Sequence, residues 1–195
     1  MKKNRYIGYK VVSNIIKFVG NIWFGGKAYG KENIPSKGRC ILAGNHLSDL
    51  DAYMLYKGTK RPIHILSKIE LFKGKMAWFF KMMLCIPVDR QNKNPKAKNE
   101  VKKILESEEV VAIFPEGTYH KDELLLPFKP GVISFAEKNN APIIPFAMKN
   151  NCKFRSKPKI VFGKPIYVDK IKAKDKVKYL EDIIRKMIVD LEKDI

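Results

Sequence analysis

Between residues 39 and 193, short apolar segments alternate with longer segments of helical periodicity, and this alternation constrains the fold most strongly. The strand-like segments are residues 39–45, 62–67, 84–89, 109–115, 141–148 and 158–163. The helix-like segments are residues 49–57, 69–83, 95–107, 131–139 and 174–193. Several strand-like segments are apolar almost throughout, which is typical of strands covered on both faces, and the alternation requires crossover connections. We therefore expect residues 31–195 to form a single α/β domain with a mainly parallel central sheet flanked by helices.

Residues 1–30 precede this pattern and predict an amphipathic helical element that ends at Gly25 and Gly26. Its apolar residues recur at helical spacing, at Ile7, Val11, Ile15, Phe18, Val19 and Ile22. Lys10 and Lys17 interrupt any apolar run long enough to span a bilayer, and no small-residue cleavage site follows, as a signal peptide would require. Such a helix either lies in a membrane interface or packs on the domain as an ordinary surface helix.

Residues 68–85 combine flexible methionines and large aromatic residues with four lysines. This composition suits an adaptable apolar surface next to anionic headgroups. The alternative is a helix that packs into the core.

The positive charge of the chain, formally +19 at pH 7, is concentrated in blocks. Residues 1–31 contain seven Lys or Arg and no acidic residue, and residues 149–164 contain six and none. A blockwise excess is expected where one surface faces an anionic partner: nucleic acid, an anionic membrane, or acidic carriers and phosphorylated substrates. The alternative is a general lysine enrichment of the source proteome.

Three cysteines, Cys40, Cys85 and Cys152, are scattered through apolar stretches without a CxxC spacing. This pattern predicts neither a disulfide framework nor a metal site, and it fits a reducing compartment. We expect buried thiols rather than nucleophiles.

The segment GNHLSDLDAYML, residues 44–55, is a strand-to-helix turn that contains residues with catalytic potential. A neutral imidazole such as that of His46 accepts a proton from an alcohol when a carboxylate such as Asp51 holds its other nitrogen. Sites in α/β sheets lie beyond the carboxyl ends of strands, which is where this turn falls. The structural alternative is that Asp49 caps the following helix and His46 is an ordinary turn residue.

A second segment, FPEGTYHKDELLLPFKPG at residues 114–131, also follows an apolar strand. Glu116-Gly117-Thr118 at the strand end, followed by basic groups, is typical of a phosphate site made from backbone N–H groups and cations. Dinucleotide-binding, Walker A, nucleophile-elbow, zinc-finger and RNP motifs are all absent from the sequence.

Four segments in order resemble the motifs of the glycerolipid acyltransferase family. NHLSDLD (45–51) is similar to its first motif, IPVDR (86–90) to its second, FPEGT (114–118) to its third and PIIPFAM (142–148) to its fourth. The joint match covers about residues 40–150 and is far more specific than any single motif. The resemblance implies an acyltransferase α/β domain at residues 31–195 and a membrane-binding helical element before it.

The resemblance also implies functional roles for individual residues. His46 and Asp51 would be the catalytic dyad, and Pro145 would shape the pocket. Positions that bind the acceptor would be Lys68, Arg90, Glu116, Gly117, Thr118 and Lys129. One position departs from the family pattern: Tyr119 stands where the family commonly has an arginine, which removes one phosphate ligand.

The implied reaction transfers a fatty acyl chain from a thioester donor, acyl-CoA or acyl-carrier protein, to the sn-2 hydroxyl of 1-acyl-sn-glycerol-3-phosphate, giving phosphatidic acid. His46 would be the general base, oriented by Asp51, with no metal or tightly bound cofactor. The implied setting is bacterial phospholipid biosynthesis, with peripheral or monotopic attachment to an anionic membrane on the cytoplasmic face. Alternative acceptors are glycerol-3-phosphate and other lysophospholipids. A nucleic-acid-binding protein would explain the charge but neither the dyad nor FPEGT, so no nucleic-acid partner is expected.

Overall fold

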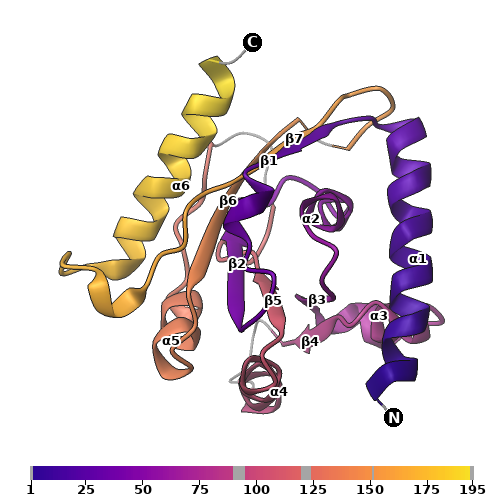
Figure 1. Cartoon of the computed structure of the whole chain (residues 1–195), viewed down its shortest axis with the longest axis horizontal. Helices are drawn as coiled ribbons and strands as arrows, with labels where there is room; N and C mark the ends of the chain where they lie inside the picture. The colour runs from indigo at the N-terminus through magenta and orange to yellow at the C-terminus, as the bar shows by residue number, and fades with distance from the viewer. Residues whose placement is uncertain (1, 90–94, 120–123, 151, 194–195) are drawn as a thin grey trace.

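A mostly parallel sheet runs through the middle of the computed structural model, which describes residues 2–89, 95–119, 124–150 and 152–193 (Figure 1). In this part of the chain, seven strands have the order β1-β7-β6-β2-β5-β3-β4, and every neighbouring pair is parallel except the antiparallel β6 and β7. The strands are β1 (Lys27–Tyr29), β2 (Cys40–Gly44), β3 (Ile63–Lys68), β4 (Ile86–Val88), β5 (Val110–Ile113), β6 (Ile143–Lys149) and β7 (Lys159–Phe162).

Helices cover both faces of this sheet, with α1 and α6 on opposite sides (Figure 1). The α-helices are α1 (Lys2–Trp23), α2 (Ala52–Gly58), α3 (Ala77–Met82), α4 (Pro95–Glu106), α5 (Gly131–Lys138) and α6 (Lys176–Lys193). Short 3-10 helices are η1 (Lys31–Asn33), η2 (Ile69–Phe72) and η3 (Val168–Lys170).

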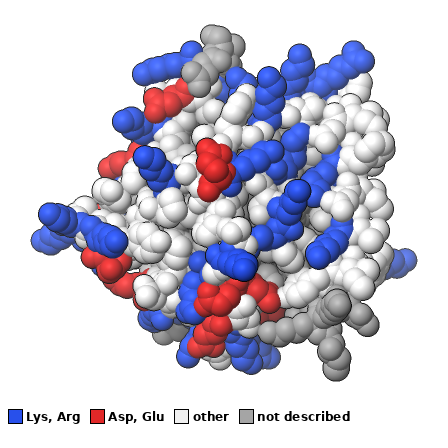
Figure 2. All heavy atoms as spheres, in the orientation of Figure 1, with Lys and Arg blue, Asp and Glu red and all other residues white. Residues whose placement is uncertain are grey.

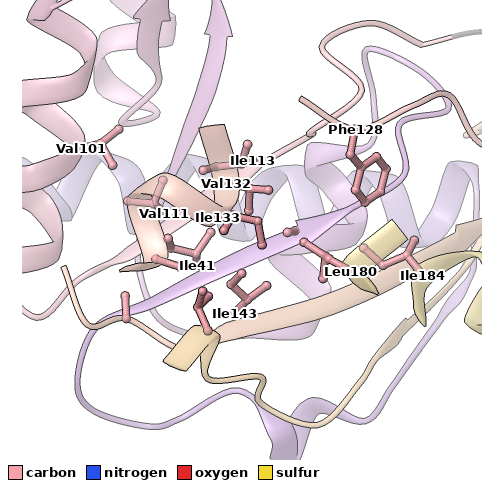
Figure 3. Packing of buried hydrophobic residues seen from close by; sticks show 14 of the residues in the cluster. Ile41, Val101, Val111, Ile113, Phe128, Val132, Ile133, Ile143, Leu180 and Ile184 are labelled. Atoms are coloured by element: carbon pink, nitrogen blue, oxygen red, sulfur yellow. The ribbon is translucent and has the colours of Figure 1, made fainter. Parts of the chain in front are cut away.

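Two hydrophobic cores lie on the two faces of the sheet. Because side chains alternate along a strand, Ile41 and Ala43 of β2 join one core while Cys40 and Leu42 join the other. The first core packs α4, α5 and α6 against the sheet, and Figure 3 shows Val101, Val132 and Leu180 among its members. The second core contains residues of α1, α2 and the end of α3. Burial on both faces explains why the central strands read as continuous apolar runs.

The predicted α/β class with a mainly parallel sheet is confirmed. The structure differs in two helices: the expected helix at 69–83 is divided into η2 and α3 by a turn around Gly74, and the helix expected from residue 49 begins at Ala52. The short strand β1 was not expected from the sequence. Its three residues are half exposed and carry no apolar run, so only pairing with β7 defines it.

The helix α1 packs on the domain with a face other than its most apolar one. Tyr9, Ser13 and Gly20 are buried, and Gly20 is required because a Cβ there would lie 2.4 Å from the Tyr53 ring of α2. The apolar residues that recur at helical spacing point to solvent instead: Ile7, Val11, Ile15, Phe18, Val19, Ile22 and also Trp23. We call these seven residues the apolar face of α1. In the described part of the chain, no helix has the length and apolar character needed to cross a bilayer.

The segment at residues 68–85 is divided between the core and the surface. Met83 and Leu84 are buried in the core, whereas Met76 and Trp78 are exposed, Trp78 by 64%. This segment therefore contributes both to the interior and to the surface beside α1.

Candidate active site

The turn at residues 45–51, which we call the catalytic turn, leaves the carboxyl end of β2 and leads into α2. Asn45 fixes its start: the Asn45 side chain donates to the Met148 carbonyl at 2.9 Å and accepts from the Met148 N–H at 2.7 Å. This paired contact joins the turn to β6, the neighbour of β2 in the sheet. Because His46 follows Asn45 directly, this contact fixes the position of His46 relative to β6.

His46 and Asp51 form the dyad that the sequence predicted, with His46 Nδ1 and Asp51 Oδ2 2.8 Å apart. Asp51 is only 2% exposed, and its carboxylate also accepts the N–H groups of Leu47 and Ser48 and the Ser48 hydroxyl. A carboxylate that accepts hydrogen bonds from several donors is ionised and acts only as an acceptor. It therefore selects the imidazole tautomer in which Nδ1 donates. The lone pair of His46 Nε2 is then available as a base.

Asp49 does not cap the helix in this structure. The N-cap position of α2 is Asp51, whose side chain turns back to the catalytic turn without making a capping bond. The expectation that Asp49 caps α2 is therefore wrong.

Glu116 is a positioning residue rather than part of the cavity wall. Its side chain is buried, one carboxylate oxygen accepting the His46 N–H at 2.8 Å and the other the Leu126 N–H at 2.8 Å. The carboxylate of Glu116 links the catalytic turn to the segment before α5, and its predicted contact with the acceptor stays a prediction.

Two aromatic rings hold the imidazole of His46. Phe114 stacks on it with ring centroids 4.1 Å apart and an interplanar angle of 18°, and Tyr119 meets it edge-on at 5.3 Å. The Tyr119 hydroxyl donates to Asp49 Oδ2 at 3.3 Å. Tyr119 thus joins the motif at 114–118 to the catalytic turn.

A cavity of 1060 Å³ opens beside the dyad. His46, Gly117, Thr118 and Tyr119 line it near the catalytic turn. Most of its remaining wall is apolar and comes from both layers of helices, including Ile16, Tyr56, Phe79, Met83, Val132 and Phe135. Its size and apolar walls suit a ligand with long hydrocarbon parts.

Two of the predicted cations, Lys68 and Lys129, also line this cavity. Lys129 lies over the backbone of Gly117, because a Cβ added there would be 2.6 Å from Lys129 Nζ. Gly117 also has a φ of 75°, which favours glycine. The predicted ligand Arg90 lies outside the described residues.

The structure does not place Pro145 on the cavity wall. Pro145 lies in β6 between Ile143 and Ala147, and by strand alternation it shares their face of the sheet, the face that α6 covers. Its ring contacts the position of Gly163, where a Cβ would lie 2.9 Å from Pro145 Cγ. The predicted role of Pro145 in shaping the pocket stays a prediction.

The cysteine thiols are unsuited to nucleophilic chemistry. Burial raises the pKa of Cys40 and of Cys85 to about 11 and that of Cys152 to about 12. A thiol with such a pKa stays protonated at neutral pH, and only the thiolate form is a nucleophile. Cys85 lines the cavity together with His46.

Sequence reasoning missed the roles of Phe114 and Glu181. The backbone N–H of Phe128, next to Lys129, donates to Glu181 Oε2 at 3.3 Å, so α6 helps to hold the segment that carries Lys129. Nothing local in the sequence marks Glu181, because its partner lies 53 residues away. The signal for Phe114 was its place at the end of β5, level with the catalytic turn.

The family model described as "Acyltransferase" matches residues 26–149. The parallel sheet, the dyad at its carboxyl edge and the large apolar cavity agree with this class of enzyme. The chain belongs to the acyltransferase family. It is 29% identical over 194 residues to 1-acyl-sn-glycerol-3-phosphate acyltransferase of Bacillus subtilis, covering 94% of this chain and 96% of that protein.

A protein of the same name from Borreliella burgdorferi is 31% identical over 144 residues, which cover 71% of this chain and 57% of that protein. Among solved structures, the 1-acyl-sn-glycerophosphate acyltransferase from Thermotoga maritima superposes with a TM-score of 0.76 and 22% identity, covering 94% of this chain and 81% of that one. At this level of identity the superposition shows a shared fold.

Proposed function

We propose that this acyltransferase transfers a fatty acyl chain from a thioester donor to the sn-2 hydroxyl of 1-acyl-sn-glycerol-3-phosphate, forming phosphatidic acid. The observation that carries the proposal is His46, held by buried Asp51, on the wall of an apolar cavity of 1060 Å³. Relatives that bear the name of this activity support the choice of acceptor.

In the proposed mechanism, His46 Nε2 takes the proton of the acceptor hydroxyl as its oxygen attacks the thioester carbonyl. Asp51 keeps the ring oriented and stabilises the imidazolium that forms. The tetrahedral intermediate collapses, the C–S bond breaks, and the thiolate leaves with the proton from His46. No acyl-enzyme forms in this mechanism. The raised pKa of the Cys85 thiol in the cavity agrees with this, because a protonated thiol is a poor nucleophile.

The phosphate of the acceptor binds, in this proposal, to the cations that line the cavity beside the motif at 114–118. Lys68, Lys129, Gly117 and Thr118 all line the cavity, which supports this part of the proposal. Arg90 belongs to the same proposal through the family resemblance. Fixing the phosphate brings the hydroxyl to the base, which lowers the barrier by removing orientational freedom.

The donor in the proposal is acyl-CoA or acyl-carrier protein. A thioester already carries an activated acyl group, so the mechanism assigns no step to a metal or a tightly bound cofactor.

We further propose peripheral attachment to an anionic membrane, on the cytoplasmic side, through the apolar face of α1. Phe18 on this face is 67% exposed, and the surrounding stretch of residues 1–31 contains no acidic residue. Over the side of the molecule that α1 forms, Figure 2 shows mainly uncharged and basic atoms. This combination suits an interfacial helix.

Tyr119 favours a second candidate, the same chemistry on another acceptor such as glycerol-3-phosphate or a different lysophospholipid. Its hydroxyl contacts Asp49 and supplies no positive charge at the position of the family arginine. In this alternative Tyr119 marks a pocket adapted to a different headgroup.

One experiment tests both candidates. The purified protein and its Asp51→Asn variant are incubated with a panel of lysophospholipids and glycerol-3-phosphate, each with acyl-CoA and acyl-carrier protein donors, and the products are identified by mass spectrometry. We expect phosphatidic acid from the wild type and a severe loss in Asp51→Asn. Phosphatidic acid absent under all conditions, with another acylated product present, establishes the alternative acceptor.

The variant Tyr119→Arg separates the two candidates further. If the site binds a phosphomonoester, the added guanidinium leaves the KM for 1-acyl-sn-glycerol-3-phosphate unchanged or lowers it. If a folded Tyr119→Arg protein no longer acylates 1-acyl-sn-glycerol-3-phosphate, the assignment of this molecule as the acceptor is contradicted.

A further inference from the structure

Two segments that contain no acidic residue meet at the C-terminal end of α1. Residues 1–31 contain seven Lys or Arg, of which Lys17, Lys27 and Lys31 lie in or after the C-terminal half of α1. Residues 149–164 contain six, of which three are on the loop at 153–157. The loop at residues 153–157, between β6 and β7, reaches the end of α1 (Figure 1), where the N–H groups of Arg155 and Lys157 donate to the carbonyls of Trp23 and Phe24 at 2.9 and 3.0 Å. The last carbonyls of a helix lack partners within the helix, so this loop caps α1 and is fixed against it.

The meeting point is aromatic as well as basic. Phe154 is 60% exposed and Trp23 is 54% exposed, yet their rings pack on each other with centroids 5.2 Å apart. The guanidinium of Arg155 lies 5.2 Å from the centre of the Phe154 ring, and Lys153 and Lys157 are exposed on the same loop. Aromatic rings and basic groups held together at a surface suit the boundary between headgroups and acyl chains.

The loop is a defined turn that presents Phe154 outward. Arg155 and Lys157 have left-handed φ values of 55° and 49°, which side chains of their size adopt only where the surroundings fix them. The Lys153 N–H donates to Ser156 Oγ at 3.0 Å, and the Ser156 N–H donates to the Lys153 carbonyl at 3.0 Å. Presenting an aromatic side chain from a fixed turn reduces the entropy lost when it binds.

We propose that the 153–157 loop, together with Trp23, is a second membrane contact that inserts Phe154 into the interface of an anionic leaflet while Lys153, Arg155 and Lys157 approach its headgroups. The inference rests on the peripheral attachment proposed above and adds a contact from residues outside the segment matched by the family model.

This second contact explains how the enzyme orients on the surface. The helix α3, with its exposed Trp78, lies beside the N-terminal half of α1, where Gly8 contacts Met82. The 153–157 loop lies at the other end of α1 (Figure 1). Contacts at both ends hold α1 parallel to the membrane plane.

The test uses the full chain and vesicles of phosphatidylcholine, with and without phosphatidylglycerol. We expect Phe154→Ser to weaken partitioning to the anionic vesicles about tenfold, and Phe154→Leu to restore most of it. Arg155→Gln removes a charge without shortening the apolar contact, and its effect of about fivefold disappears at high salt. The matched control is Tyr179→Ser, an exposed aromatic residue on α6 on the opposite side of the sheet, which leaves binding within about twofold.

A second readout reports the loop contact through its effect on Trp23, which also belongs to the apolar face of α1. The chain has two tryptophans, so Trp78→Phe leaves Trp23 as the only one. We expect brominated phosphatidylcholine in anionic vesicles to quench Trp23 fluorescence in this variant, and Phe154→Ser to reduce that quenching.

The outcomes separate the two proposals. If the wild-type protein does not bind anionic vesicles, the proposed attachment itself is contradicted. Wild-type protein that binds, while Phe154→Ser and Arg155→Gln bind equally well and Phe154→Ser leaves the quenching of Trp23 unchanged, overturns only the second contact. Reduced affinity of these variants for single-stranded RNA, with vesicle binding unchanged, also overturns it and assigns the loop to nucleic acid instead.

Discussion

In the catalytic turn, backbone N–H groups and buried carboxylates are paired with one another, whereas on the apolar face of α1 large side chains point to solvent. Asp51 alone accepts bonds from His46, Leu47 and Ser48. On α1, by contrast, the exposed residues share only their apolar character and their side of the helix. The first region depends on the geometry of a few atoms, and the second on a property summed over many residues. Single substitutions should therefore have large effects in the turn and small, additive effects on α1.

The largest effect tests whether the turn is as indispensable as this contrast requires. We expect His46→Ala to lower kcat by ~10²–10⁴-fold, because a positioned general base contributes that much. Binding to anionic vesicles should be unchanged, since His46 lies at the cavity and not on α1. Near-normal turnover in steady-state assays of a folded His46→Ala protein would rule out the proposed mechanism.

A cation of the cavity should show an intermediate effect. A hydrogen bond to a charged group is worth about 1.5–3 kcal/mol, so Lys68→Ala should lower kcat/KM for the phosphorylated acceptor by roughly 10- to 150-fold. The KM for the donor should change little. Lys129→Ala should behave in the same way but less severely, because its side chain also covers Gly117.

A change below about twofold in acceptor kinetics for both lysine variants identifies them as ordinary surface cations. Lys138→Ala is the matched control, because Lys138 lies at the exposed end of α5 and does not line the cavity.

The positioning role of Glu116 can be tested without touching the dyad. Glu116→Gln keeps the size of the side chain but turns one acceptor into a donor, so either the His46 N–H or the Leu126 N–H loses its partner. We expect a loss of about tenfold in kcat, with Glu116→Ala worse, since an unsatisfied buried N–H costs about 1–3 kcal/mol. A loss confined to the KM of the acceptor would instead indicate that Glu116 contacts substrate.

On α1, single substitutions should have modest effects that accumulate. We expect Phe18→Ser to weaken binding to anionic vesicles severalfold, and Ile15→Ser with Phe18→Ser to weaken it by about the product of the two, because hydrophobic transfer is roughly proportional to area. Sedimentation with vesicles measures this. Turnover of acceptor dispersed in detergent should stay at the wild-type level; a collapse of turnover there would mean that the apolar face also serves the active site.

The smallest effect is expected at a residue inside the cavity. Because burial raises the pKa of Cys85 to about 11, only roughly one thiol in a thousand is ionised at pH 8. Iodoacetamide near neutral pH should therefore leave transfer activity intact, and the alkylation rate should rise about tenfold per pH unit until the pH reaches the pKa. Rapid inactivation at pH 7 would show that the thiol is activated.

The sequence predicted what depends on local pattern. The apolar strands and the approximate helices follow from spacing within a few residues. The spacing of His46 and Asp51 left a structural alternative open, and the family resemblance implied the pairing that the structure contains. The family resemblance, rather than spacing, implied that Lys68, Lys129, Gly117 and Thr118 belong to one site, and all four line the cavity.

What the sequence did not predict depends on contacts between distant segments. Glu116 carries a polar side chain in a motif, and only the fold shows that its partners are backbone N–H groups 70 and 10 residues away. The same holds for α1, whose periodicity identified an apolar stripe correctly but gave no sign that Tyr9, Ser13 and Gly20 would face the domain. Gly20 must be small because the Tyr53 ring of α2 packs against it, and the periodicity of α1 contains no information about a contact with another helix.

The pairing of β1 with β7 has a consequence for the order in which the chain acquires its structure during synthesis. Lys27–Tyr29 aligns with Lys159–Val161, so this edge of the sheet, like the cap of α1 by Arg155, waits until most of the chain has left the ribosome. Contacts so distant in sequence form late. Until then, α1 is a nascent basic and apolar helix without its final neighbours, and a membrane surface close to the ribosome is free to capture it before the sheet closes.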